Sequence, residues 1–219
     1  MLDVLYEDNH LLVVNKPAML PTMGVAADQP SLLAEAKEYI RHKYNKPGEV
    51  YLGVVSRLDA PVTGVLVIAR TSKAAARLTE SFKRRDVEKI YWALVPGAVH
   101  PPAGQLVHYL RKDERHRRMH VTTAAAAAAQ RAELNYRVLR KCQGNSLLEL
   151  ELLTGRKHQI RVQLADAFAP VLGDRKYGSQ SPFPLGIALH SHRLNLLHPV
   201  RKIPLEIVAP LPPSWPPNV

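Results

Sequence analysis

An acidic residue between two apolar runs is the first candidate for chemistry in this sequence. Asp59 stands in a short polar segment, with the apolar run 50–55 before it and the run 64–69 after it. A carboxylate between buried strands costs desolvation free energy unless it is paired or hydrogen-bonded, and in its ionised form it can act as a nucleophile. A turn residue is the alternative, because Asp shortly before a proline, here Pro61, commonly forms turns. Position alone leaves both interpretations open.

A cluster of basic side chains forms a second candidate site. Residues 155–161 read Gly-Arg-Lys-His-Gln-Ile-Arg, at the start of a helix that we expect over 158–168. Helix N-termini attract anions through their unbonded N–H groups and their dipole. Cations are locally unfavourable there, and such conflicts often mark functional sites. The cluster therefore indicates an anionic ligand, and a solvated basic face is the plainer alternative.

An aromatic pair in an expected strand is the third feature. The run 89–95 is rich in aromatic and branched residues, which favour strands. Alternation places Tyr91 on one face of that strand and Trp92 on the other. Core packing is the more frequent role of such a residue, whereas stacking on a nucleobase is the functional alternative.

Composition narrows the class of partner. The 219 residues include 30 Lys and Arg against 19 Asp and Glu, a formal net charge of +11 that favours polyanions such as RNA. The sequence contains no metal-ligand cluster, Walker A loop or GxGxxG motif, so nothing supports a metal or nucleotide cofactor. A single cysteine, Cys142, no signal peptide and no apolar run near 20 residues indicate a soluble, cytoplasmic protein.

The elements that must position these residues are mostly short strands. A hairpin is expected from strands at 2–6 and 11–14, and further strands at 50–55, 64–69, 89–95, 105–110, 133–140 and 146–152. Helices are expected from Ser31 towards Pro47-Gly48, from Ser72 to about Arg84, and over 158–168. The alanine tract 124–129 could extend a helix or lie in a loop, and the proline-rich tail 204–219 is expected to be irregular. The predicted fold class is α+β: a mixed, mostly antiparallel central sheet with flanking helices and a basic cleft.

Five segments in one order resemble the RluA-type family of RNA pseudouridine synthases. They read VVNKP at 13–17, RLD at 57–59 with TGVLV at 63–67, KIYWALV at 89–95, LTGRKHQIRVQL at 153–164, and GDRKYG at 173–178 followed by Leu189-His190. The resemblance covers most of the chain. It implies the pseudouridine synthase catalytic fold and an isomerase, without a cofactor, that breaks the N1–C1′ bond of a uridine and rejoins the base through C5.

The resemblance also assigns roles. It implies that Asp59 is the nucleophile, that Arg161 pairs with it bidentately, and that Tyr91 stacks on the base or assists proton removal. The route of attack, at C1′, at C6 or through a glycal, is left open. RNA, ribosomal or transfer, is the expected partner of a monomeric enzyme that needs no metal and no membrane. RNA contacts are expected from Lys16, Arg57, Arg156, Lys157, His158 and Gln159.

Two departures from the family pattern bear on this expectation. Ser56 stands where the family commonly has His, and Val62-Thr63-Gly64 stands in place of Thr-Ser-Gly. We interpret these as altered RNA handling; the alternative is a catalytically silent RNA-binding protein on the same fold. There is no room ahead of Leu2 for an S4-type RNA-binding domain, so residues 1–219 are expected to form a single catalytic domain.

Overall fold

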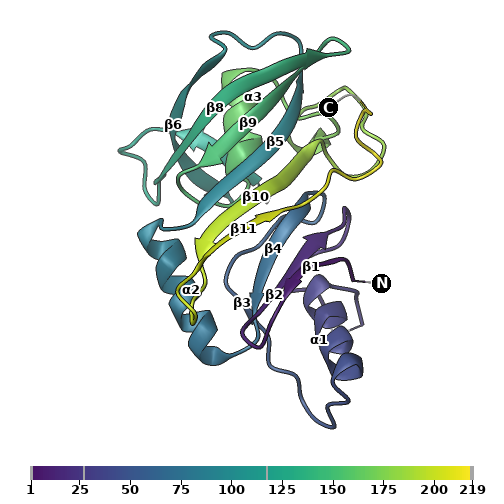
Figure 1. The fold of residues 1–219 in the computed structure, drawn as a ribbon. Coiled ribbons are helices and arrows are strands. Elements are labelled where there is room, and N and C mark those ends of the chain that lie inside the picture. Colours follow the sequence, from purple (N-terminus) through teal and green to yellow (C-terminus); the bar gives the residue numbers. More distant parts are fainter. Residues whose placement is uncertain (1, 27, 117, 218–219) are drawn as a thin grey trace. The chain divides into compact units, whose positions relative to one another are not determined.

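The computed structural model describes residues 2–26, 28–116 and 118–217, which form two compact units (Figure 1). Unit 1 contains the chain up to Val87 together with Ser191–Pro212. Unit 2 contains Glu88–His190 and the chain from Pro213 onward. That the two units make one catalytic domain stays a prediction, because compactness alone does not decide whether they fold and act together.

Unit 1 is built on antiparallel strands. β1 (Val4–Glu7) and β2 (Leu11–Lys16) form the expected N-terminal hairpin. β2 then pairs with β4 (Thr63–Ala69), and the short β3 (Gly53–Val54) pairs with the far end of β4. All seven residues of β4 are buried. The last residue of β2 and the first residues of β4 lie next to each other, so both strands support the segment that contains Asp59.

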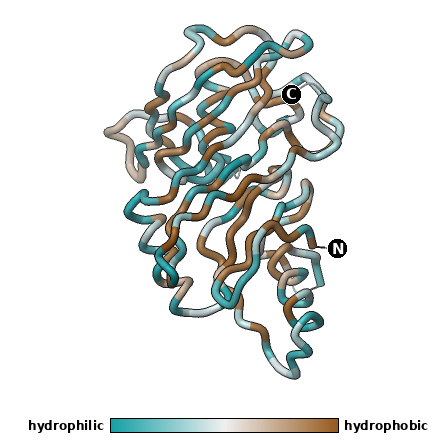
Figure 2. Tube along the Cα trace, in the orientation of Figure 1, coloured by the Kyte–Doolittle hydropathy of each residue, from teal (hydrophilic) through white to brown (hydrophobic). Residues whose placement is uncertain are grey.

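Two helices and a second hairpin complete unit 1. The helices are α1 (Leu32–Lys43) and α2 (Ser72–Arg84). β10 (Leu189–Leu197) continues into this unit from Ser191 and pairs with β11 (Pro204–Val208). Figure 2 shows hydrophobic colour along β2 and β4 and hydrophilic colour over much of α1. Residues of β2, β4, α2, β10 and β11 form one buried apolar cluster that includes Leu11, Val13, Val65, Val67, Leu78, Leu194 and Ile207.

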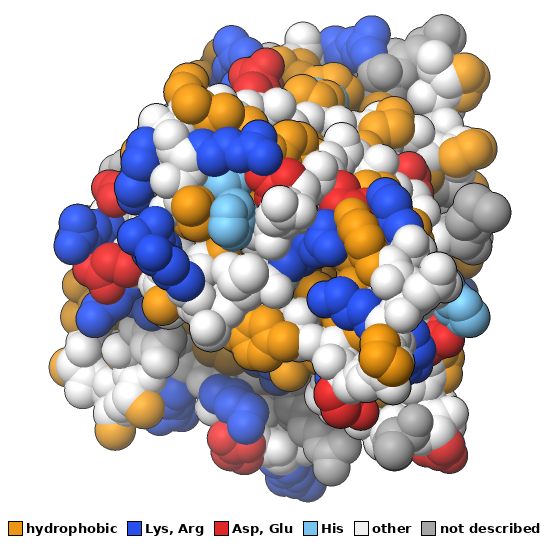
Figure 3. Space-filling model, turned by 60° about the horizontal axis from the view of Figure 1, so that its bottom comes forward, with side chains coloured by type: hydrophobic (Ala, Val, Ile, Leu, Met, Phe, Trp, Pro, Cys, Tyr) orange, Lys and Arg blue, Asp and Glu red, His pale blue; other side chains and the backbone are white. Residues whose placement is uncertain are grey.

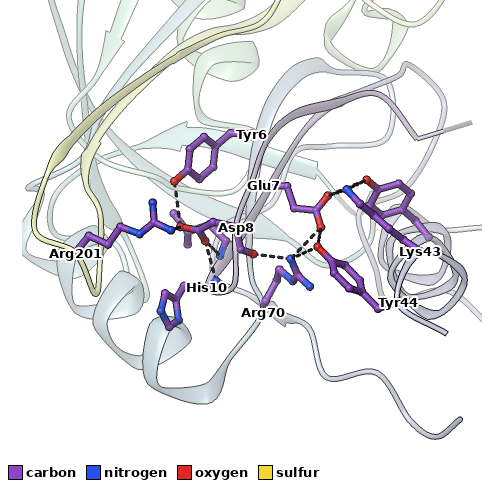
Figure 4. Close-up of polar contacts among 10 residues, drawn as sticks. Tyr6, Glu7, Asp8, His10, Lys43, Tyr44, Arg70 and Arg201 are labelled. Atoms are coloured by element: carbon purple, nitrogen blue, oxygen red, sulfur yellow. Dashed lines mark hydrogen bonds and ion pairs between the residues drawn. The ribbon is translucent and has the colours of Figure 1, made fainter. Parts of the chain in front are cut away.

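A polar network fastens the N-terminal hairpin to the end of α1 and the end of β4 (Figure 4). The carboxylate of Glu7, with 7% of its side chain exposed, accepts hydrogen bonds from Tyr39, Lys43, Tyr44 and Arg70. Burial by itself would raise the pKa of Glu7, but the hydrogen bonds from Lys43, Tyr44 and Tyr39 outweigh it and lower the pKa. The Glu7 carboxylate thus joins the N-terminal hairpin to α1 and to the end of β4.

The neighbouring Asp8 closes the turn of the same hairpin. Its Oδ1 accepts from the backbone N–H groups of His10 and Leu11, both at 2.8 Å. Its Oδ2 accepts from Tyr6 and lies 2.9 Å from Nε2 of His198, whose ring is completely buried. Burial opposes ionisation of Asp8, yet these hydrogen bonds together lower its pKa. The turn of the predicted hairpin is therefore stabilised by the acidic side chain of Asp8.

Unit 2 contains an antiparallel sheet of five strands in the part of the chain that the structure describes. It contains β5 (Glu88–Pro96), β6 (Ala103–Asp113), β7 (Arg118–Thr122), β8 (Gln130–Cys142) and β9 (Asn145–Leu152). The strands lie in the order β5-β9-β8-β6-β7, so β5 pairs with β9, which is much later in the sequence. This pairing places Tyr91 opposite Leu150.

One α-helix and a short 3-10 helix pack on this sheet. α3 (Gln159–Ala167) lies against β6 and β7, and η1 (Arg175–Tyr177) follows it. Val162 of α3 packs in an apolar cluster with Leu110, Met119 and Ala132. Six consecutive residues of α3, Gln159–Leu164, are buried. The helix that carries Arg161 is therefore held on a rigid sheet.

The predicted fold class is confirmed in its main features. Every strand pairing given above is antiparallel, and three α-helices accompany the strands in the described part of the chain. Ser31 caps α1 as predicted, with its Oγ accepting from the backbone N–H of Ala34. No helix in that part of the chain is long and apolar enough to cross a membrane.

Three local predictions need correction, and one open alternative is decided. The run 50–55 contributes only Gly53–Val54 to the sheet. Thr71, not Ser72, caps α2, because its Oγ1 accepts from Ala74 N. Of the two alternatives for the alanine tract, the loop is observed: the tract lies in the connection between β7 and β8 and forms no helix. The tail is not irregular throughout, because Pro204–Val208 forms β11. Proline is tolerated as the first residue of a strand, where its missing N–H group is not required for pairing.

Candidate active site

The segment that contains Asp59 forms a tight turn at the start of β4. The carbonyl oxygen of Asp59 accepts from the backbone N–H of Val62 at 3.0 Å, which places Ala60 and Pro61 at the centre of the turn. The main chain of Asp59 thus has the turn role that the sequence suggested. Its side chain is half-buried and Arg57 is exposed. The turn role and a chemical role for the carboxylate are compatible, because they use different atoms.

The buried amine of Lys16 is hydrogen-bonded to this turn. Its side chain is 0% exposed, and its Nζ donates to the carbonyl oxygens of Pro17 (2.7 Å), Leu20 (2.8 Å) and Ala60 (3.1 Å). Burial lowers the pKa of Lys16 to about 7, and the nearby Asp59 opposes that shift. The prediction that Lys16 contacts RNA does not fit this placement, because all three hydrogens of the ammonium group are used within the chain.

Thr22 forms hydrogen bonds with the residue before Asp59. Its Oγ1 donates to the carbonyl oxygen of Leu58 at 2.8 Å and accepts from the Leu58 backbone N–H at 3.2 Å. The residues on either side of Asp59, Leu58 and Ala60, are therefore both bonded to the segment 16–22. This role of Thr22 could not be predicted, since a lone threonine in a loop carries no distinguishing sequence signal.

Gly64 fixes where β4 begins. It has a φ of +111°, and an added Cβ would lie 2.2 Å from the carbonyl oxygen of Ser191. Only glycine tolerates both the backbone conformation and the close approach. The position within the sequence motif Val62-Thr63-Gly64 thus has a physical reason, and it anchors the chain five residues after Asp59.

In unit 2, the guanidinium of Arg161 is paired with Asp174. Nε donates to Oδ2 at 2.6 Å and Nη2 donates to Oδ1 at 2.8 Å, and both side chains are buried. This is a side-on bidentate pair, the strongest form of such a contact. The bidentate pairing of Arg161 with Asp59 that the resemblance implies stays a prediction. Within the segment GDRKYG, nothing in the residue types alone distinguishes Asp174 as the partner of Arg161.

The same guanidinium lies over the ring of Tyr177. The ring centroid is 5.1 Å from Cζ of Arg161. The Tyr177 hydroxyl accepts from the backbone N–H of Met119 at 3.1 Å and lies 2.8 Å from Nδ1 of His158. Spacing in the sequence could not reveal this cluster, because its members come from β7, the start of α3 and η1.

The basic cluster divides into exposed and buried members. Arg156 and Lys157 are exposed and His158 is half-buried, which suits a contact with an anion. Gln159 is 2% exposed; its Oε1 accepts from Thr154 Oγ1 and Arg156 N, and its Nε2 donates to a backbone carbonyl oxygen. The prediction that Gln159 contacts RNA does not fit this placement, because its amide closes the N-terminus of α3.

Tyr91 lies on β5 with its side chain half-buried, whereas Ala93 and Val95 on the same face are buried. The alternation expected from the sequence is therefore present, and Tyr91 is the least buried of these three. No group of three or more His, Cys, Asp or Glu side chains in the described ranges could hold a metal ion. Lys and Arg side chains clearly outnumber Asp and Glu on the surface drawn in Figure 3.

Comparison with known proteins supports one family. A family model described as RNA pseudouridylate synthase matches residues 10–166. The ribosomal large subunit pseudouridine synthase D of Xylella fastidiosa is 37% identical over 226 residues, which cover 96% of this chain and 66% of that protein. The protein of the same name from Escherichia coli K12 is 33% identical, with 96% and 67% covered. This chain thus spans about two thirds of the length of these relatives.

Solved structures lead to the same family. Human RNA Pseudouridylate Synthase Domain Containing 4 matches with a TM-score of 0.80 and 28% identity, over 96% of this chain and 89% of that one. Human RNA Pseudouridylate Synthase Domain Containing 1 matches with a TM-score of 0.77 and 25% identity, over 97% and 84%. With the matched segment containing Asp59, Tyr91 and Arg161, the chain belongs to the RNA pseudouridylate synthase family.

Proposed function

We propose that this protein isomerises uridine to pseudouridine in RNA, with Asp59 as the nucleophile. The observation that carries the proposal is the placement of Asp59: a half-buried carboxylate on a turn whose neighbouring residues are fixed by Lys16 and Thr22, within the segment matched to the family. A catalytic group gains most when the protein fixes its position before substrate binds. The relatives named above act on the large ribosomal subunit, so we propose ribosomal RNA as the substrate class.

The reaction is a balanced isomerisation. The N1–C1′ bond breaks, the base turns, C5 bonds to C1′, and the proton lost from C5 is matched by one gained at N1. Asp59 forms the covalent intermediate or stabilises the positive charge on the sugar. Tyr91 stacks on the base or accepts the C5 proton. Arg161 supplies a fixed positive charge, because Asp174 and Tyr177 already restrain its guanidinium.

The RNA must be presented with its target base unstacked. Enzymes that rework a base take it out of the helix at a cost of a few kcal/mol, which contacts to the backbone offset. We propose that Arg57, Arg156, Lys157 and His158 make such contacts, since these four side chains are exposed or half-buried. A monomeric state, a cytoplasmic location and a reaction without metal or cofactor stay predictions.

The test uses unmodified transcripts of large-subunit ribosomal RNA and, in a parallel arm, of transfer RNA. We expect wild-type protein to form pseudouridine at discrete positions of the ribosomal transcript, detected by carbodiimide labelling and primer extension. Asp59→Asn should remove the product while RNA binding stays within about twofold, since the change alters one charge and no shape. The control is Asp86→Asn, an exposed aspartate beyond the end of α2, which should keep wild-type activity.

The outcomes are decisive. If wild type and Asp59→Asn give identical pseudouridine maps, Asp59 is not the nucleophile. If wild type binds both transcripts and modifies neither, the enzyme function is refuted and a binding protein remains. Modification of the transfer RNA alone would overturn the substrate class and keep the reaction.

A further inference from the structure

Tyr177 joins the candidate catalytic arginine to two segments with exposed basic side chains, one at Arg118 and one at Lys157. We propose that Tyr177 is a positioning residue for Arg161, with its ring fixing the guanidinium and its hydroxyl tying that guanidinium to His158 and to β7. The proposal rests on the isomerase function proposed above. It goes beyond that function because it names a residue through which bound RNA can influence the geometry of the reaction.

The ring of Tyr177 and the carboxylate of Asp174 restrain Arg161 in different directions. Asp174 holds the edge of the guanidinium with hydrogen bonds of 2.6 and 2.8 Å in its plane. Cζ of the guanidinium lies over the Tyr177 ring, 5.1 Å from the ring centroid. A cation is attracted to an aromatic face, and the attraction is stronger where water is excluded. Arg161 is only 5% exposed, so both contacts act in a largely dry environment.

The hydroxyl of Tyr177 contacts two residues that directly follow exposed basic side chains. It accepts from Met119 N, directly after the exposed Arg118 in β7. It also lies 2.8 Å from Nδ1 of His158, directly after the exposed Lys157. A phosphate bound by Arg118 or by Lys157 would therefore lie next to a residue that contacts the Tyr177 hydroxyl. A phenylalanine would keep the ring and lose both connections.

The main chain holds Tyr177 firmly enough for this role. The segment begins at Gly173, with a φ of +81° and space for no Cβ, because one would lie 2.7 Å from the Phe183 Cβ. It ends at Gly178, with a φ of +94°. Between these two glycines the single turn η1 places Asp174 and Tyr177 around one guanidinium. The carbonyl oxygen of Asp174 accepts from the backbone N–H groups of Tyr177 (3.0 Å) and Ser179 (3.1 Å), and these hydrogen bonds hold the segment in place.

The experiment compares Tyr177→Phe and Tyr177→Leu with wild type and with a matched control, Tyr136→Phe. Tyr136 lies in the same unit, is 6% exposed, donates to a backbone carbonyl oxygen and packs edge-on against Phe168, but does not contact Arg161. The measurements are the single-turnover rate on the ribosomal transcript, the dissociation constant for that RNA, and the melting temperature. A second measurement follows the Nε–H signal of Arg161 by NMR, assigned through its loss in Arg161→Lys.

We expect the single-turnover rate to fall about tenfold in Tyr177→Phe, the effect of losing about one hydrogen bond in the transition state. In Tyr177→Leu it should fall about a hundredfold, because a misplaced catalytic group costs that much. RNA affinity should stay within about threefold, and Tyr136→Phe should keep the wild-type rate. The Arg161 Nε–H signal should shift in Tyr177→Leu as the ring current is lost, and should exchange faster with solvent.

Rates for both Tyr177 variants equal to that of Tyr136→Phe would overturn the inference while leaving the proposed function intact. A rate loss that only follows the fraction of unfolded protein would also overturn it, since that is a structural effect. If wild type forms no pseudouridine, the proposed function fails, and the NMR signal still decides the positioning role. An Arg161 signal unchanged in Tyr177→Leu would then refute it.

Discussion

Arg161 and Asp174 form a buried bidentate ion pair, with Nε–Oδ2 and Nη2–Oδ1 distances of 2.6 and 2.8 Å. The two residues are 13 positions apart in sequence and lie on opposite sides of the end of α3. Charges this deeply buried are tolerated only when each is paired and hydrogen-bonded. The catalytic arginine expected from the sequence therefore has an acidic partner within its own unit, and that partner is open to test.

Asp174→Asn should destabilise the protein strongly. The substitution keeps the shape of the side chain but leaves Arg161 without its carboxylate, and removing one partner of a buried pair costs about 3–5 kcal/mol. Urea unfolding monitored by circular dichroism measures the loss. Asp166→Asn is the control, because Asp166 is 48% exposed and only 3.3 Å from His108, a surface pair that contributes less than about 1 kcal/mol. Equal losses in the two variants would contradict the assigned role of Asp174.

Gly64→Ala should be among the most damaging single substitutions in the chain. The new Cβ would meet the Ser191 carbonyl oxygen at 2.2 Å, and alanine would also have to adopt a φ of +111°. Strain of this kind adds to the overpacking, so a loss above about 4 kcal/mol or insoluble protein is expected. Gly48→Ala, where an added Cβ meets nothing within 4 Å, should change stability by less than about 1 kcal/mol. A folded Gly64→Ala protein with wild-type melting temperature would show that β4 can begin elsewhere.

The difference in stability between wild type and Lys16→Met should depend on pH, because the amine of Lys16 is buried. Burial lowers the pKa of Lys16 to about 7, below the ordinary value of 10.5 that it has in the unfolded chain. Between these two pH values the unfolded state binds one more proton than the folded state, so stability from this group rises with pH. The slope is at most about 1.4 kcal/mol per pH unit. The deficit of Lys16→Met relative to wild type should therefore grow from pH 7 to pH 10 and be constant below pH 6.

Urea unfolding of wild type and Lys16→Met at five pH values measures this difference. Lys46→Met, which changes an exposed lysine, is the control and should show no pH-dependent difference. A deficit that shrinks as the pH rises would mean that Lys16 binds its proton more tightly in the folded protein than burial allows.

RNA binding should depend steeply on salt. If about five phosphates are contacted, log K should fall with log salt at a slope of roughly −3.5 to −4.5. Replacing Arg156 and Lys157 together by glutamine should make the slope less steep by roughly 1.4–1.8, the share of two phosphates. Lys46→Gln should leave it unchanged. Fluorescence anisotropy at several salt concentrations measures the slopes, and an unchanged slope in the double variant would remove these two residues from the interface.

Local signals in the sequence were sufficient for many elements. The β1–β2 hairpin, the Ser31 cap of α1 and the antiparallel character of the strands depend on residue type over a few positions, so spacing could predict them. The motif residues Asp59, Tyr91 and Arg161 could be found because their order resembles a known family. The start of α2 differed by one residue, since Thr71 and Ser72 can both cap a helix and only the backbone selects between them.

Partners of buried polar groups could be seen only in the tertiary structure. The contacts of Lys16 with Ala60 and of Thr22 with Leu58 join positions 44 and 36 residues apart, and no spacing encodes them. From the sequence, Lys16 is a candidate RNA contact because lysine is usually exposed. Its burial depends on the residues that pack around it, which only the tertiary structure shows. The sequence therefore determined which groups could do chemistry. The fold decided which of them are exposed, which are held, and by what.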